Sequence, residues 1–410
     1  MKHLVGGISS AGRALPEING QPLMIERAEG AWLWDSQGQR WMDTALGFGA
    51  TLLGHNPPAV VDAVQQTVKK MMMPAFSHAL EEEAAVALSA FTGELNKVIF
   101  VNSGSEAVHL ACRAARAATG RQKVVKFAAG YDGWFDQVAF GNAGSPVAKM
   151  PHSSRPEKEG MLLLRYNDFQ DVDALFAGHA DIAAVVIEPV MANAGCIEPA
   201  EGYLKYLAEA AHRAGALVVL DEVLMGFRLH VGLCGHLFGV DADFATVGKA
   251  IGNGTVVAAL VGKAHCMAVF EDGRAVRAGT YSGNPPVCAA VIATLKELAG
   301  KDYMQLLRSG DELCRKVIAD CQAKGIALAS SGYGTVFTFW PQACAPENYA
   351  QAVAAADHDW SMAIHLALRQ QQILSMPSAF GRYYLSFSHD QQATDALASA
   401  CSAAIIARSA

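Results

Sequence analysis

Short apolar runs alternate with longer alanine-rich stretches through the middle of the chain. The runs are VVKF (124–127), AAVVIEP (183–189), ALVVLDE (216–222), FATVGK (244–249) and VVAALVG (256–262). Their length and β-branched content are typical of buried strands, and the stretches between them are typical of helices. This alternation predicts an α/β fold in which a mostly parallel central sheet is covered by helices on both faces.

A second set of alternating elements follows the first. The segment VCAAVIATLKELAG (287–300) predicts a long helix that leads into further strands and helices from about Lys301 onward. We expect these elements to form a smaller α+β domain together with the first part of the chain. The predicted division is a large domain over 45–290 and a small domain made of 1–44 and 291–410.

The segment VIFVNSGSEAVHLACRAAR (98–116) predicts a strand over 98–102, a turn of small residues, and a helix from about Ser105 through Ala118. Gly104 allows the sharp turn. The amides of Gly104, Ser105 and Glu106 would then point out of the helix N-terminus, which stabilises an anion such as a phosphate. The Ser105 hydroxyl could bind the same anion, or Ser105 could be only the N-cap of the helix.

Two residues at the ends of apolar runs indicate the chemistry. Asp221 closes ALVVLDE and Lys249 closes FATVGK, and ligands of parallel sheets gather at the carboxyl ends of strands. A lysine amine can form a Schiff base with pyridoxal 5′-phosphate, while a carboxylate keeps the pyridine nitrogen of that cofactor protonated. Each residue alone could be a solvated loop lysine or a capping aspartate. With the predicted phosphate site, they indicate a pyridoxal phosphate enzyme whose Lys249 also shuttles a proton, which requires a neutral amine.

Six segments, in this order and spacing, resemble the class III (ω-type) aminotransferases of fold type I: VNSGSEA, KFAAGYDGW, VVIEPV, LDEVLMGFR, TVGKAIGNG and AGTYSGNP. The amino end, GGISSAGRA and the segments after it, is most similar to the branch that contains glutamate-1-semialdehyde aminomutase and β-phenylalanine aminotransferase. The resemblance covers nearly the whole chain, from about Gly6 to the final helix. It implies a fold-type I enzyme that acts on small-molecule amines and keto acids.

The resemblance also implies roles for individual residues. Ser103, Gly104 and Ser105 would bind the cofactor phosphate. The ring of Tyr131 would stack on one face of the cofactor and Val223 would cover the other, although a turn tyrosine and a core valine are the ordinary alternatives. Further cofactor contacts are implied for Glu188, near the phenolic oxygen, and for Asn193, near the same region or the substrate.

Thr280 in AGTYSGNP matches the residue that, in this family, crosses a dimer interface to bind the phosphate of the neighbouring subunit. The resemblance therefore implies a homodimer whose active sites lie at the interface. The alternative is that Thr280 only caps the turn that follows it.

Substrate choice is indicated by three residues, with departures from the aminomutase pattern. Arg13 in SSAGRA matches an arginine that holds a substrate carboxylate, and Phe48 stands where aminomutases generally have Trp. Aminomutases read PSxFE where this chain has Gly381 and then Arg382, and Asp132 replaces a usual His.

A cation in place of a carboxylate favours anionic ligands. We therefore expect an intermolecular aminotransferase for a carboxylate-bearing amine, such as a β-amino acid. A glutamate-1-semialdehyde aminomutase, a racemase or decarboxylase on this fold, and an inactive relative are the alternatives.

Composition restricts the other function classes. The chain of 410 residues is 52% hydrophobic and only 17% charged, and a net charge of −7 without a basic run argues against a nucleic-acid surface. Nine cysteines without CxxC pairing and thirteen histidines without HExxH spacing predict no metal site. The segment GKAIGNG lacks the GxGxxG spacing of a dinucleotide site. The sequence shows no long apolar stretch that would indicate a signal peptide or a membrane span, so we expect a cytoplasmic protein.

Overall fold

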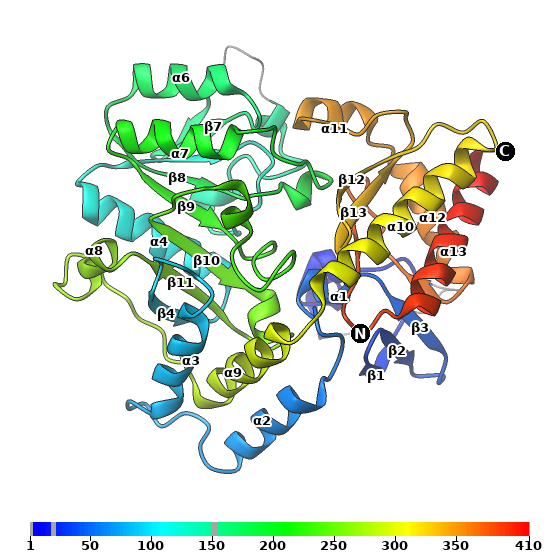
Figure 1. Ribbon diagram of the computed structural model, residues 1–410, viewed down its shortest axis with the longest axis horizontal. Helices are drawn as coiled ribbons and strands as arrows, with labels where there is room; N and C mark the ends of the chain where they lie inside the picture. The colour runs from blue at the N-terminus through cyan, green and yellow to red at the C-terminus, as the bar shows by residue number, and fades with distance from the viewer. Residues whose placement is uncertain (1–2, 18–21, 150–154, 410) are drawn as a thin grey trace.

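The computed structural model describes residues 3–17, 22–149 and 155–409. Its largest element is an eight-stranded sheet (Figure 1). In spatial order the strands are β4 (Lys97–Val101), β11 (Ala258–Gly262), β10 (Phe244–Gly248), β9 (Leu217–Asp221), β8 (Ile182–Ile187), β5 (Lys123–Phe127), β7 (Met161–Leu164) and β6 (Glu157–Lys158). The five strands from β10 to β7 are mutually parallel, while β11 and β6 run antiparallel to their neighbours. The predicted mostly parallel sheet is confirmed.

Helices cover both faces of this sheet. Successive residues of a strand point to opposite sides, so an apolar strand has side chains to bury on each face. In β9, Val219 belongs to a buried cluster with Val108 of one helix, whereas Val218 belongs to another cluster with Leu204 of a second helix. In the described part of the chain the α-helices are α1 (Leu46–Gly49), α2 (Pro58–Val68), α3 (Ala79–Ser89), α4 (Gly104–Thr119), α5 (Asp136–Ala139), α6 (Phe169–Gly178), α7 (Tyr203–Arg213), α8 (Ala264–Met267), α9 (Pro285–Ala299), α10 (Tyr303–Gln322), α11 (Tyr349–Ala355), α12 (His358–Gln370) and α13 (Gln391–Ser409).

Two smaller sheets lie beside the large one, with α10, α12 and α13 packed together near them (Figure 1). The first contains β1 (Ile25–Glu29), β2 (Trp32–Asp35), β3 (Arg40–Asp43) and β14 (Ile373–Leu374). The second contains β12 (Ala329–Tyr333), β13 (Val336–Trp340) and β15 (Tyr383–Tyr384). Since β14 pairs with β3, the two ends of the chain meet in one sheet. The division into two domains at 45 and 290 stays a prediction.

The strand, turn and helix around residue 104 agree with the predicted positions to within one residue. The alternative that Ser105 is the N-cap is wrong. The side chain of Ser103, and not that of Ser105, accepts a hydrogen bond from the Glu106 amide at 3.3 Å. Ser105 therefore lies inside the first helical turn, where its hydroxyl is available for other contacts.

Eight of the nine cysteines are buried, and all nine are free thiols, while Cys344 is exposed. The buried thiols behave as small apolar side chains, as expected. Within the described ranges, no helix combines the length and the apolar character that crossing a membrane requires.

Candidate active site

A cavity of about 330 Å³ lies at the carboxyl edge of the central sheet. It opens where β8, β9 and β10 end and where helix α4 begins. Parallel strands bring their carboxyl ends to one edge, so side chains that are far apart in the sequence meet there. The cavity wall includes Ser103, Gly104, Ser105, Tyr131, Asp132, Trp134, Glu188, Asn193, Asp221, Val223 and Lys249.

Asp221 is the last residue of β9 and is buried. Its Oδ1 atom accepts hydrogen bonds from the Val223 amide at 3.0 Å and from the Thr246 hydroxyl at 3.1 Å. Both donors reach the same oxygen, so Oδ2 keeps the capacity to accept another. Burial, together with the charge of Asp132, raises the pKa of Asp221 to about 7. A cationic partner in the cavity would therefore stabilise the ionised carboxylate.

Lys249 follows β10 directly and begins a short 3-10 helix, Lys249–Gly252. Its backbone is left-handed, with φ of 44°, a conformation that costs free energy for a residue with a side chain. Burial lowers the pKa of the Lys249 amine to about 8, although Asp221 and Glu188 act in the opposite direction. A substantial neutral fraction near pH 8 is what an amine needs in order to act as a nucleophile or a base.

The start of α4 has backbone amides that can bind an anion. The first intrahelical bond runs from the Ala107 amide to the Ser103 carbonyl at 3.1 Å, so the amides of Gly104 and Ser105 precede the helical ladder and can bind a ligand. The Ser105 hydroxyl accepts a hydrogen bond from the Trp134 amide at 3.2 Å. A Cβ atom at Gly133 would come within 2.6 Å of that hydroxyl, so glycine permits this close approach.

A buried carboxylate holds the loop that carries Tyr131. Glu188, at the end of β8, accepts a hydrogen bond from the Tyr131 amide at 2.7 Å. Burial, and then the charges of Asp132 and Asp221, raises the pKa of Glu188 well above its usual range. The Tyr131 side chain is half exposed at the cavity wall, which leaves one side of its ring accessible to a ligand.

Lys126, which sequence analysis did not single out, holds the loop that carries Gly130 and Asp132 beside the cavity. It lies in β5 with a completely buried side chain. Its ammonium group donates to the Gly130 carbonyl (3.0 Å), the Val138 carbonyl (2.5 Å) and Asn142 Oδ1 (2.6 Å), and it lies 3.2 Å from Asp132 Oδ2. The signal for this residue was the single charge inside the apolar run VVKF. A buried lysine requires a partner, and Asp132 is that partner.

Four of the residues expected at the site do not line the cavity. Arg13 and Thr280 are exposed, and Thr280 lines a separate surface hollow with Met73, Phe76 and their neighbours. Phe48 precedes Ala50, which does line the cavity. Arg382 is largely buried, and it donates to the Tyr384 hydroxyl at 2.9 Å and to the Ala192 carbonyl at 3.1 Å. Its charge still reaches Lys249, whose pKa it lowers.

One group of described side chains has the spacing of a metal site: Asp243, His265 and Cys266. The Asp243 carboxylate already accepts a hydrogen bond from the Val218 amide at 2.9 Å and lies 2.9 Å from His212 Nε2. The Lys263 ammonium group lies 3.7 Å from it. Because a metal cation would have to displace these partners, the group is better explained as a polar network at the edge of β10.

The comparisons with known proteins agree with this geometry. The model of the aminotransferase class-III family matches residues 16–340. The chain belongs to the class III aminotransferases. Three solved structures are similar over most of their length. They are an omega-transaminase from Sphaerobacter thermophilus (26% identity, 95% of this chain and 92% of that chain, TM-score 0.88), a β-phenylalanine aminotransferase from Variovorax paradoxus (29%, 98% and 90%, 0.86) and a glutamate-1-semialdehyde aminomutase from Pseudomonas aeruginosa (25%, 94% and 88%, 0.83).

Class III aminotransferases use pyridoxal phosphate, and the cavity of this class III enzyme fits that cofactor. The backbone amides at the start of α4, a carboxylate with a free oxygen and a lysine of lowered pKa line one cavity. Glycine at position 104 lets the start of α4 pack closely against Val223, because a Cβ atom there would come within 2.9 Å of the Val223 methyl groups. The donor set therefore matches a phosphate, a basic ring nitrogen and an aldehyde.

Proposed function

We propose that this class III enzyme is an intermolecular aminotransferase that moves an amino group from a carboxylate-bearing amine, such as a β-amino acid, to a keto acid. The observation that carries this proposal is the environment of Arg382. Its guanidinium group is buried near Lys249, and among the described residues it forms no ion pair with a carboxylate. A buried cation without an acidic partner is costly, and a substrate carboxylate would supply that partner.

We assign the cofactor contacts as follows. The amides and hydroxyls of Ser103, Gly104 and Ser105 would hold the phosphate, and Asp221 would hold the ring nitrogen. Tyr131 and Val223 would cover the two faces of the ring, with Glu188 and Asn193 near its phenolic oxygen. When bound, pyridoxal phosphate supplies a ring that accepts electrons from the substrate carbon. All these residues lie at the cavity wall, which supports the assignment.

Lys249 would have two tasks. Its amine would first hold the cofactor covalently, and after release it would remove and return a proton at the substrate carbon. The lowered pKa of Lys249 supports the second task, because only a neutral amine accepts a proton. Asp221 would remain ionised opposite the positive ring nitrogen and so stabilise the charge that the reaction requires.

Gly381 argues against the aminomutase alternative. A Cβ atom at this position would lie 2.5 Å from the Met376 carbonyl oxygen and 2.8 Å from that of Ser378. The glutamate that aminomutases have at this place therefore does not fit without a shift of the backbone. Two of the similar structures are named as transaminases and one as an aminomutase, so these names alone do not decide between the reactions.

A homodimer in the cytoplasm completes the proposal. Phe76 and Met72 are exposed apolar side chains, and Phe76 borders the same surface hollow as Thr280. Apolar side chains at such a position suit a subunit interface. In the dimer, Thr280 would bind the phosphate in the neighbouring subunit, which would explain why it does not line the cavity of its own chain.

The two half-reactions test this function. We expect an amine donor to convert the bound cofactor to its amine form, and pyruvate or 2-oxoglutarate to convert it back. Arg382→Ala should raise the acid concentration required by about ten- to a hundredfold, because a charged hydrogen-bonded pair is lost. The first half-reaction with an amine that lacks a carboxylate should change much less. Stopped-flow absorbance of the bound cofactor measures both steps.

Analysis of the products of the same reactions distinguishes the alternatives. Fast conversion of glutamate-1-semialdehyde to 5-aminolevulinate, with no discharge onto any keto acid, would favour the aminomutase. Loss of substrate chirality or release of carbon dioxide without amino transfer would favour a racemase or a decarboxylase. A protein that binds the cofactor but changes no amine would be an inactive relative.

A further inference from the structure

The short helix α1 is a left-handed turn. Its four residues have φ of 46° (Leu46), 58° (Gly47), 58° (Phe48) and 83° (Gly49). Two of them carry side chains, for which this conformation costs free energy, so the surroundings must hold the turn in place. The turn leads directly into Ala50 at the cavity wall, and the Phe48 ring packs against Gly12 of the N-terminal segment.

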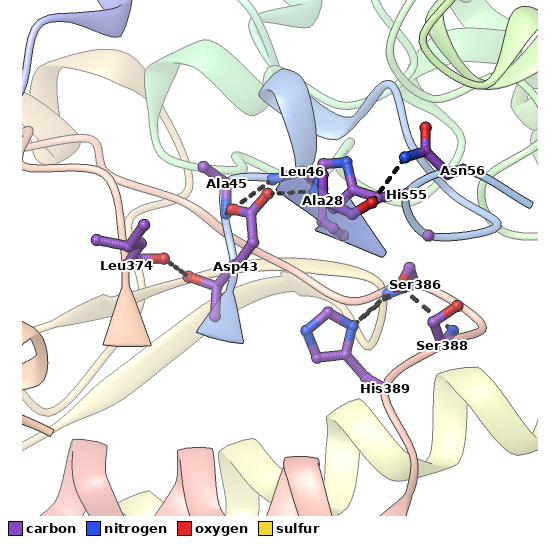
Figure 2. A network of polar contacts seen from close by, with 12 residues as sticks. Ala28, Asp43, Ala45, Leu46, His55, Asn56, Leu374, Ser386, Ser388 and His389 are labelled. Atoms are coloured by element: carbon purple, nitrogen blue, oxygen red, sulfur yellow. Dashed lines mark hydrogen bonds and ion pairs between the residues drawn. The ribbon is translucent and has the colours of Figure 1, made fainter. Parts of the chain in front are cut away.

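Asp43 holds the beginning of this turn. Its Oδ1 atom accepts hydrogen bonds from the amides of Ala45 at 2.8 Å and Leu46 at 3.0 Å, and its Oδ2 atom lies 2.8 Å from His55 Nε2. Figure 2 shows these residues grouped around the Asp43 carboxylate, with the Ser386 and His389 pair nearby. The start of the turn is therefore anchored through a side chain that has its own second partner.

Arg228 holds the end of the turn. Its side chain is completely buried, and it donates to the carbonyl oxygens of Gly49, of Leu224 (3.3 Å) and of Thr335 (3.5 Å). These acceptors belong to three separate segments, and no described carboxylate forms an ion pair with Arg228. A Cβ atom at Gly49 would come within 2.9 Å of both Arg228 Nη2 and Tyr384 Cε1. The guanidinium group therefore fits only against a glycine.

Arg228 also contacts the residue that holds Arg382. The Arg228 guanidinium carbon lies 5.3 Å from the centre of the Tyr384 ring, within the range of a cation–π contact. The hydroxyl of the same tyrosine accepts the hydrogen bond from Arg382 Nε at 2.9 Å. The Tyr384 side chain thus contacts both buried arginines. Burial is the main cause of the lowered pKa of Lys249, and the charges of the two arginines lower it further.

We propose that Arg228 is a positioning residue for the carboxylate side of the active site: it fixes the left-handed turn through Gly49 and, through Tyr384, sets the direction of Arg382. This inference rests on the proposed function, because it assumes that Arg382 binds a substrate carboxylate. Arg228 does not contact the substrate, since its side chain is completely buried and does not line the cavity. Its fork shape suits this role, because the planar guanidinium group fixes the directions of its donors, whereas the donors of a lysine all leave one atom at the end of a flexible stem.

The test compares Arg228→Lys with a matched control in the holoenzyme. Arg121 also donates to main-chain carbonyls, those of Ile182 at 3.0 Å and Ala214 at 2.8 Å, but it lies at the amino ends of the strands, away from the cavity. We expect Arg228→Lys to raise the KM for 2-oxoglutarate and the Kd for succinate by about tenfold, since the direction of a charged donor is lost. The first half-reaction with 1-phenylethylamine should stay within about twofold of the wild type, because that amine has no carboxylate to bind.

Tyr384→Phe provides an independent variant that leaves Arg228 and the fold of the turn intact. It removes only the hydroxyl that orients Arg382, so both acid constants should rise as in Arg228→Lys. Arg121→Lys should change none of them. Equal losses for the acid and for the amine without a carboxylate in Arg228→Lys, or unchanged acid constants in Tyr384→Phe, would overturn the inference. The second variant decides the outcome if Arg228→Lys does not fold.

Binding of succinate by calorimetry separates the two possible failures. A wild-type holoenzyme that binds succinate but transfers no amino group to any keto acid contradicts the proposed function. If its succinate affinity then falls in both variants, the positioning role of Arg228 is still supported. A wild-type enzyme that transfers amino groups to keto acids but is insensitive to both substitutions contradicts the inference alone.

Discussion

At the scale of single residues, the chemistry depends on what burial does to a few ionisable groups. Lys249 and Asp221 share one cavity, and their pKa values move toward each other, to about 8 and about 7. The shifts arise from desolvation, which disfavours the charged form of both a base and an acid. A lysine whose pKa is near neutrality can act as a base. The ionised form of a buried aspartate is stabilised when a cation is bound beside it.

The reactivity of Lys249 in the cofactor-free protein should therefore depend on pH around a midpoint near 8. Only the neutral amine is nucleophilic, so labelling by an acylating reagent should increase as the pH rises through this midpoint and then level off. Asp221→Asn should move the midpoint to lower pH, because the charge of Asp221 raises the pKa of Lys249. Mass spectrometry of the Lys249 peptide measures the rate. A midpoint near 10.5 in both proteins would contradict the assignment.

At the scale of elements, one strand and one loop form the floor of the site. Strand β5 contributes Lys126, and the loop after it contributes Asp132 and the Gly130 carbonyl. The ion pair is buried on both sides, with 0% and 2% of the two side chains exposed. Removing one partner of such a pair leaves an uncompensated charge, which is more harmful than removing both.

This predicts a strong coupling between Lys126 and Asp132. Lys126→Met alone should destabilise the protein by about 3 kcal/mol and speed the release of the cofactor, because the Tyr131 loop loses its anchor. Lys126→Met combined with Asp132→Asn should recover a large part of this loss. Denaturant unfolding and the near-ultraviolet circular dichroism of the bound cofactor measure the two effects. Additive effects of the two substitutions would show that the pair does not act as a unit.

At the scale of the whole molecule, the described chain leaves apolar side chains at the surface beside Thr280. Phe76 is 83% exposed and Tyr281 is 66% exposed. Large exposed rings in one region are typical of a surface that is covered in the assembled protein. The exposed position of Thr280 is understandable if the active site is completed by a second subunit.

Phe76→Asp should therefore weaken the dimer, because a charge would be buried without a partner in the interface. Sedimentation velocity should show a shift from dimer to monomer at micromolar concentration. Thr280→Val should leave the dimer intact and weaken phosphate binding, which would raise the Kd of the cofactor by about tenfold. A wild-type protein that is monomeric, with unaltered cofactor affinity in Thr280→Val, would contradict both expectations.

Local and periodic features of the sequence determined the fold class and the main chemical groups. The alternating apolar runs specified the sheet, and the small residues at 103–105 specified a turn and a helix start, because these depend on near neighbours in the chain. Lys249 and Asp221 could be placed at the same edge of the sheet because Asp221 ends β9 and Lys249 directly follows β10. Only the tertiary structure decided that Arg228 reaches Gly49, 179 positions away, and that Lys126 pairs with Asp132. Such contacts depend on strand order and on where loops fold back, which no local pattern records.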